Sequence, residues 1–259
     1  CNRMRAVASA IALADDTGHE LRIIWNIDTE LGCPFEMLFR PIKGVKVINN
    51  NHLFFNRHLG NIFRVLNKKL STAKMLLKKN IIFVLASNKH IYNIHGKDQL
   101  THNKSIYIMS CSQFFEAEEK LSLFNPIPDL DNTLKKYTAI IPGSIGIHIR
   151  RGDHELSKKI SKTSVFLKAI EREVLKDSSI QFFLSTDSFS VESELRDIFG
   201  ERIIFHNKKS TRRHTSYAIQ DALIDLYCLS FCNKIIGSYK SSFSEMAAML
   251  GKIELIIAQ

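Results

Sequence analysis

Four apolar segments of strand length alternate with helical patterns in the second half of the chain, and this alternation limits the possible folds more than any other feature. The apolar segments are residues 144–149, 180–185, 202–205 and 234–238. The helical patterns cover roughly 163–176, 191–199, 216–231 and 242–250. Strands and helices that alternate at this spacing are typical of a parallel sheet with helices on both faces. The sequence therefore predicts an α/β fold.

Small polar or charged residues follow three of these apolar segments, at positions 150–153, 186–188 and 239–242. In open α/β sheets, ligands bind in the crevice outside the carboxyl ends of the strands. Because the same kind of ending recurs, we expect these residues to line one shared ligand site.

Two adjacent arginines, Arg150 and Arg151, come directly after the first apolar segment. Guanidinium groups are rarely buried in a hydrophobic core, since each would need a partner there. A planar guanidinium can instead bind a diphosphate through two hydrogen bonds. The alternative is a surface ion pair between Arg151 and Asp153, and this segment alone favours neither interpretation.

An ordered set of four motifs resembles the GDP-fucose-dependent fucosyltransferases. The motifs are His-x-Arg-Arg-Gly-Asp at 148–153, Ser-Thr-Asp at 185–187, Asp225 on an expected helix, and a Ser-rich turn at 237–242. The resemblance is to the superfamily that contains the α1,6-fucosyltransferases, the protein O-fucosyltransferases and the rhizobial nodulation fucosyltransferase. Residues 1–10 are similar to the segment that opens the N-terminal domain of these enzymes, although the glycines that usually precede its Asn are absent.

The resemblance implies an α/β fold of the GT-B type, in which two Rossmann-like domains with parallel sheets face each other across a cleft. A chain of 259 residues is long enough for two domains. Three of the five prolines lie between positions 126 and 142. We therefore expect an acceptor-binding domain at 1–135 and a domain that binds the nucleotide sugar at 136–259.

In the first of these domains, the hydrophobic pattern predicts both helices and strands. The expected helices cover about 2–16, 59–79 and 112–123. The expected strands cover 21–26, 45–48, 81–85 and 105–109.

The resemblance gives Arg150 the main catalytic role. A fixed arginine next to the departing diphosphate stabilises the transition state more than the ground state. The alternative for Arg150 is a structural ion pair. The resemblance also brings His148 close to the nucleotide, and on a strand His148 shares a face with Arg150. A lone strand histidine is otherwise most often structural, and Arg151 either assists with phosphate or holds Asp153.

For the rest of the nucleotide, the resemblance implies that Asp225 accepts hydrogen bonds from N1 and the amino group of guanine. The alternative is an exposed residue between apolar helix positions. Ser238, Ser241 and Ser242 surround the start of a helix, where hydroxyls and free N–H groups form an anion site, although capping of that helix is an alternative or additional role. Asp187 binds the ribose, the sugar or a nearby arginine, and the sequence does not distinguish these.

The general base is less well defined by the sequence. The α1,6-type enzymes carry a Glu about ten residues after the motif His, and Lys158 occupies that position here. Asp153 is our first choice and Glu155 is the other nearby carboxylate, while some related enzymes are thought to need no base. By resemblance, Asn2 faces the donor or the acceptor, and Arg3 and Arg5 add positive charge nearby.

Basic residues are distributed unevenly along the chain. The net charge is +10, and residues 41–97 contain eleven Lys or Arg and no Asp or Glu. The helix expected at 59–79 is therefore basic and amphipathic. Packing against the core with a solvated basic face is slightly favoured. The alternative is peripheral contact with an anionic membrane or an anionic glycan acceptor. Nucleic acid is not expected, because aromatic residues are not interleaved with the charges.

Further expectations concern cofactors, acceptor and compartment. The five cysteines, at positions 1, 33, 111, 228 and 232, form a poor disulfide framework. We expect no cofactor and no metal, because arginine and serine can hold the phosphates of the GDP-fucose donor.

The acceptor would be a glycan, a lipid-linked precursor or a glycoprotein. Without an apolar run of membrane-spanning length or a signal peptide, we expect a cytoplasmic protein, peripheral at the inner membrane if the basic helix binds lipid.

The composition, rich in Lys, Ile and Asn, suggests a bacterial source. Two other functions stay open at this point: transfer of a different sugar from a nucleotide, and binding of a nucleotide or glycan without catalysis.

Overall fold

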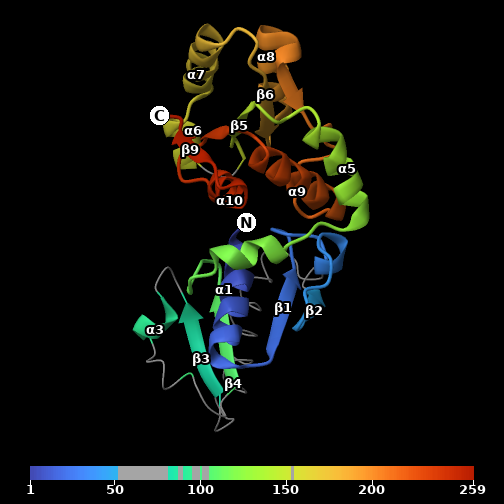
Figure 1. The fold of residues 1–259 in the computed structure, drawn as a ribbon, viewed down its shortest axis with the longest axis vertical. Coiled ribbons are helices and arrows are strands. Elements are labelled where there is room, and N and C mark those ends of the chain that lie inside the picture. The colour runs from blue at the N-terminus through green and yellow to red at the C-terminus, as the bar shows by residue number, and fades with distance from the viewer. Residues whose placement is uncertain (52–80, 87–89, 95–99, 101–104, 153–154) are drawn as a thin grey trace. The chain divides into compact units, whose positions relative to one another are not determined.

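The computed structural model describes residues 1–51, 81–86, 90–94, 100, 105–152 and 155–259 (Figure 1). The chain divides into two compact units. The first comprises Cys1–Thr29 and Pro41–Asn125, and the second comprises Glu30–Arg40 and Pro126–Gln259. The helix expected at 59–79 and the candidate base Asp153 lie outside the described residues.

The first unit contains two pairs of parallel strands. Helix α1 (Asn2–Thr17) ends at Gly18, whose φ of 70° is left-handed. Strand β1 (Leu21–Ile27) pairs with β2 (Val45–Asn51), and β3 (Ile81–Ala86) pairs with β4 (Ser105–Ser110). The short helices are η1 (Phe35–Met37), which belongs to the second unit, and α3 (Ile91–Ile94) and η2 (Glu118–Leu123) in the first. The expected first helix and the four expected strands are thus confirmed.

The helix expected at 112–123 is wrong, since only its last half is helical, as the 3₁₀-helix η2. Backbone groups at the start of that segment bond to other elements instead. The Phe114 amide donates to the Ser9 hydroxyl (3.2 Å), and the Phe114 carbonyl accepts from the Ile91 amide (2.8 Å). Phe114 is buried with Leu13, Ile91 and Leu100, so its hydrophobic character supports tertiary packing and not a helical face.

The second unit is built on a five-stranded parallel sheet in the order β7-β6-β5-β8-β9. The strands are β5 (Ile145–Ile149), β6 (Phe182–Thr186), β7 (Ile203–Phe205), β8 (Lys234–Gly237) and β9 (Glu254–Ile257). Every residue of β5 and β6 is buried. Such continuous burial is expected where helices cover both faces of a parallel sheet.

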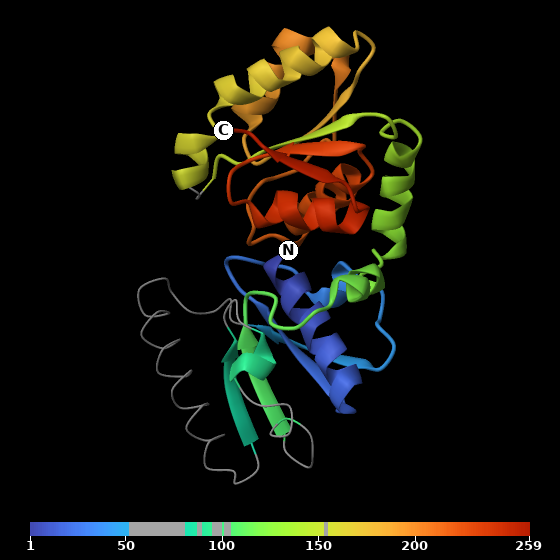
Figure 2. The ribbon, with the colours of Figure 1, turned by 60° about the vertical axis from the view of Figure 1, so that its left-hand side comes forward.

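Helices cover both faces of this sheet. The helices are α5 (Pro128–Thr138), α6 (Glu155–Ile160), α7 (Thr163–Lys176), α8 (Phe189–Phe199), η3 (Gly200–Arg202), α9 (Ser216–Ser230) and α10 (Ser242–Gly251). Phe166 and Ile170 of α7 pack with Ile147 and Ile149 of β5 in one core cluster. Figures 1 and 2 show α7 and α8 on one side of the sheet and α9 and α10 on the other. Ile147 and Ile149 therefore face α7, while His148 between them faces α10, with which it bonds.

The segment 30–40 belongs to the second unit although it comes early in the sequence. The Gly32 amide donates to the Arg213 carbonyl (2.9 Å), and the Ile127 amide donates to the Leu38 carbonyl (3.1 Å). The second unit thus includes residues 30–40 and 126–135, which the sequence pattern assigns to the first domain.

The expected α/β class with parallel sheets is confirmed. In the part of the chain that the structure describes, no helix has both the length and the apolar character needed to cross a bilayer. The five cysteines are all free thiols. No cluster of three or more metal-binding side chains occurs among the described residues.

Candidate functional site

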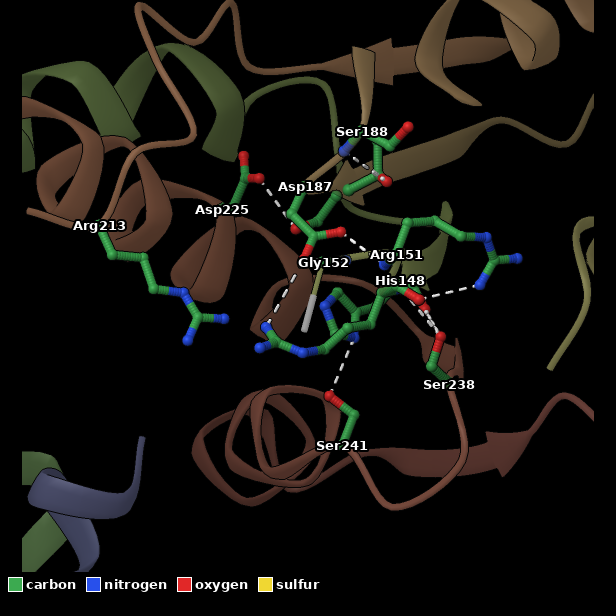
Figure 3. A network of polar contacts seen from close by, with 12 residues as sticks. His148, Arg151, Gly152, Asp187, Ser188, Arg213, Asp225, Ser238 and Ser241 are labelled. Atoms are coloured by element: carbon green, nitrogen blue, oxygen red, sulfur yellow. Dashed lines mark hydrogen bonds and ion pairs between the residues drawn. The ribbon is translucent and has the colours of Figure 1, made fainter. Parts of the chain in front are cut away.

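Polar side chains gather where β5, β6 and β8 end. The sheet register places His148 of β5 opposite Ser185 of β6 and Gly237 of β8. The residues that follow, Arg150, Asp187 and Ser238, consequently lie at one edge of the sheet. Figure 3 shows His148, Asp187 and Ser238 close together, as the recurrent strand endings in the sequence predicted.

Asp187 holds the loop that follows β5. Its Oδ1 accepts a hydrogen bond from the Arg151 amide (2.6 Å), and its Oδ2 accepts one from the Gly152 amide (3.0 Å). The Arg150 guanidinium forms an ion pair with Oδ2 at 3.7 Å. A Cβ on Gly152 would lie 2.7 Å from Oδ2, so a larger residue here would displace the Asp187 carboxylate. Of the three roles considered for Asp187, the structure shows contact with an arginine.

Arg150 is fixed at both its backbone and its side chain. Its amide donates to the Ser238 hydroxyl (2.9 Å), and that hydroxyl also donates to the His148 carbonyl (3.2 Å). The Arg150 side chain is 17% exposed. Ser238 thereby joins the ends of β5 and β8, and Asp187 aligns the guanidinium from the side of β6.

Arg151 differs from its neighbour. Its guanidinium donates to the carbonyls of Arg150 and Ser161 (both 2.9 Å) and to the Thr163 hydroxyl (3.1 Å). Burial lowers the pKa of Arg151. In Figure 3 its side chain extends away from His148 and Asp187. These contacts give Arg151 a structural role in tying the loop to the start of α7.

His148 is buried, and its imidazole lies against the start of α10. Its Nδ1 is 2.6 Å from the Ser244 hydroxyl and 3.5 Å from the Ser241 hydroxyl. The ring stacks on Phe243, with centroids 4.8 Å apart. Burial lowers the pKa of His148 to about 3, an effect that Arg150 reinforces and Asp187 opposes. The imidazole is therefore neutral near pH 7.

The start of α10 carries the serines expected at an anion site. Ser241 is the N-cap residue, and its side chain makes no capping hydrogen bond. It lies beside His148 instead, so simple capping does not account for its hydroxyl. Ser242 is the first residue of the helix. Hydroxyls and free backbone N–H groups at such a position favour anions.

Asp225 on α9 is 3% exposed, so the alternative of an exposed helix residue is wrong. Its Oδ2 accepts from the Ser185 hydroxyl (2.8 Å) and lies 3.1 Å from Nζ of Lys208. Its Oδ1 has no hydrogen-bond partner within the described part of the chain. Burial raises the pKa of Asp225, and Lys208 and Ser185 oppose that rise.

The other expected residues lie elsewhere. Asn2 begins α1 in the first unit. The Arg3 guanidinium is paired with Asp28 (3.0 Å) and lies over the ring of Trp25. Glu155 forms an exposed ion pair with Lys158 (2.8 Å).

Sequence reasoning missed Lys208 and Ser244. Lys208 lies in a connection where nothing in the pattern distinguishes it from its exposed neighbour Lys209. Ser244 could have been inferred, because it follows the noted serines on the first turn of α10.

Comparison with solved structures shows which known proteins share this fold. NodZ, a fucosyltransferase from Bradyrhizobium, superposes with a TM-score of 0.56 at 18% identity, covering 95% of this chain and 88% of that one. POFUT1 in complex with GDP-fucose gives a TM-score of 0.53 at 12% identity, covering 97% and 93%. A mutant of Arabidopsis thaliana FUT1 in complex with GDP gives a TM-score of 0.59 at 12% identity, covering 99% of this chain and 67% of that one.

The chain has the fold of these fucosyltransferases. The expected GT-B fold class is therefore confirmed. No family model matches the sequence, and no curated protein matches it.

Proposed function

We propose that this chain is an inverting fucosyltransferase that transfers fucose from GDP-fucose to a glycan or glycoconjugate acceptor. The observation that carries the proposal is Arg150 at the carboxyl end of β5, whose guanidinium pairs with Asp187 and whose amide donates to Ser238. Likeness in fold to NodZ and to POFUT1, each solved with GDP-fucose, supports the choice of donor.

Arg150 would act on the leaving group. Cleavage of the bond between the sugar and the β-phosphate builds negative charge on the diphosphate, and a guanidinium already in place needs no reorganisation. Ser241, Ser242 and the N-terminus of α10 add donors and the positive end of a helix dipole. Because these groups can neutralise the diphosphate, we propose that the reaction needs no metal.

Asp225 would read the base. A carboxylate with one oxygen bonded to the protein and the other without a partner can accept from the N1–H and amino group of guanine. Oδ1 is closed to solvent, so a base reaches it only by displacing the side chains that cover it.

Asp153 as the general base and Asn2 as a further catalytic residue remain proposals. The same holds for a lipid-linked or glycoprotein acceptor, a cytoplasmic location and membrane contact through residues 59–79. Flotation with anionic vesicles tests the membrane contact, and the absence of binding would exclude it.

Calorimetric titration with GDP, GMP and UDP tests the donor site. For the wild type we expect GDP to bind best. Arg150→Ala should remove most of the preference for GDP over GMP, about tenfold or more, because the lost contact is to the second phosphate. Asp225→Ala should remove the preference for GDP over UDP.

Arg172→Ala serves as the matched control, because Arg172 is an exposed arginine on α7 in the same unit. It should bind all three nucleotides as the wild type does. If the wild type binds no nucleotide, the proposed function is wrong. Release of fucose from GDP-fucose, with GDP-mannose for comparison, then tests the sugar.

A further inference from the structure

A buried lysine lies beside the candidate base-reading residue. Lys208, in the connection between β7 and α9, has a side chain that is only 5% exposed. Its Nζ lies 3.1 Å from Oδ2 of Asp225 and 3.7 Å from Oε2 of Glu192 on α8. Lysine is almost never buried this deeply unless it is paired. One ammonium thus lies between two carboxylates, which are 4% and 14% exposed.

The hydrogen bonds on Asp225 are distributed unevenly. Both protein donors, the Ser185 hydroxyl and the Lys208 ammonium, lie on Oδ2, whereas Oδ1 receives none from the described residues. A buried acceptor without a donor destabilises the folded protein. Two donors on one oxygen also fix the plane of the carboxylate and therefore the direction in which Oδ1 points.

The charge on Asp225 decides what Oδ1 can accept. An ionised carboxylate accepts hydrogen bonds at both oxygens, whereas a protonated one carries an O–H donor. Burial raises the pKa of Asp225, and Lys208 is the largest influence in the opposite direction. Without Lys208, the carboxyl group would stay neutral to a higher pH.

We propose that Lys208 is a positioning residue that keeps Asp225 ionised and oriented, so that Oδ1 accepts from the guanine edge. Glu192 pairs with the same ammonium and thereby weakens the effect of Lys208 on Asp225. The inference rests on the proposed function, because it assumes that Asp225 contacts the base. Lys208 itself acts through Asp225 and touches no nucleotide.

The variants Lys208→Met, Lys208→Arg and Lys209→Met separate this role from general effects of charge. Met keeps the length and apolar stem of Lys208 but removes its ammonium. Arg keeps the charge. Lys209 is the exposed neighbour, so Lys209→Met removes one positive charge from the same connection without touching Asp225. Each variant is titrated with GDP, IDP and UDP from about pH 6 to about pH 8.5.

At pH 7 we expect Lys208→Met to lose about tenfold or more of the preference for GDP over UDP. The loss should shrink as the pH rises, because Asp225 then ionises without help. The affinity for IDP, which lacks the amino group of guanine, should fall less than the affinity for GDP. Lys208→Arg should recover most of the preference, and Lys209→Met should match the wild type. Other groups near Asp225, namely His206, Tyr137 and Cys228, are shared by all variants, so they do not cause differences between the variants.

Glu192→Gln gives the opposite test and remains informative if Lys208→Met does not fold. With Glu192 neutral, Lys208 interacts with Asp225 alone and should lower the pKa of that carboxyl. The preference for GDP should then extend to lower pH than in the wild type. An unchanged pH profile in Glu192→Gln would contradict the proposal.

The two proposals can fail separately. If the wild type prefers GDP and Lys208→Met keeps that preference at every pH, the role of Lys208 is wrong and the donor site stands. If the wild type binds no GDP, both proposals are wrong.

Discussion

At the scale of single residues, Asp187 sets the geometry of the loop that follows β5. One carboxylate accepts two backbone N–H groups and pairs with the Arg150 guanidinium. A carboxylate has two acceptor oxygens and no donor, so it can serve all three groups at once. An amide of the same shape cannot, because one of its two ends is itself a donor.

Asp187→Asn should therefore leave the amide of Arg151 or Gly152 without an acceptor and release the Arg150 side chain. We expect a loss of about 1–3 kcal/mol in the free energy of unfolding and weaker GDP binding. Urea denaturation and calorimetry measure the two effects.

The matched control is Asp197→Asn, the same change at an exposed position on α8. It should alter neither quantity. If Asp187→Asn bound GDP as tightly as the wild type, Asp187 would not position Arg150 for the nucleotide.

At the scale of elements, the sequence predicted best where burial determined the pattern. Helix α7 has the expected bounds of 163–176, because its apolar residues repeat at helical spacing and pack on the sheet. Strand β9 was missed because it has four residues and alternates between exposed and half-buried positions at the sheet edge. Helix α5 was missed although Pro128 at its start and Lys135 and Lys136 at its end are ordinary signals for a helix.

Part of the candidate site could be predicted from the residues at the strand ends. Arg150, Asp187 and Ser238 could be placed together from the order of the strands. The burial of Lys208 and the use of Arg151 within the loop could not, since both depend on which side chains surround them in three dimensions. The same reason explains why the sequence does not reveal that segment 30–40 belongs to the second compact unit.

Segment 30–40 gives a prediction at this scale. A Cβ on Gly32 would lie 2.2 Å from the His214 carbonyl oxygen, a backbone atom that cannot move alone. Gly32→Ala should push the connection between β7 and α9 away and cost about 1–3 kcal/mol in the free energy of unfolding. Because that connection carries Lys208, the preference for GDP over UDP should also fall. Thermal denaturation and calorimetry measure both.

Gly18→Ala provides the contrast. Gly18 has a left-handed φ of 70° and open space where a Cβ would lie. Its replacement should cost about 1–2 kcal/mol through backbone strain alone and leave nucleotide binding unchanged. Equal effects of the two substitutions on GDP binding would show that the contact of Gly32 with His214 does not support the site.

At the scale of the whole molecule, the described residues that we assign to the nucleotide belong to one of the two units. His148, Arg150, Asp225, Ser238 and Ser241 are all in the second unit, on one sheet and the helices that flank it. A ligand that binds the folded state and not the unfolded state stabilises the protein by about 2.7 kcal/mol at a concentration of 100 times its Kd. The location of that stabilisation therefore reports which unit holds the nucleotide.

Hydrogen exchange with and without saturating GDP measures this directly. Amides at the ends of β5 and β8 and at the start of α10 should gain the most protection, because phosphate contacts fix these segments. Amides of β1 and β4 in the first unit should change less. UDP at the same concentration should protect the segments that contact phosphate but not the part of α9 around Asp225. Protection confined to the first unit would place the nucleotide elsewhere and contradict the assigned site, whatever the affinity proved to be.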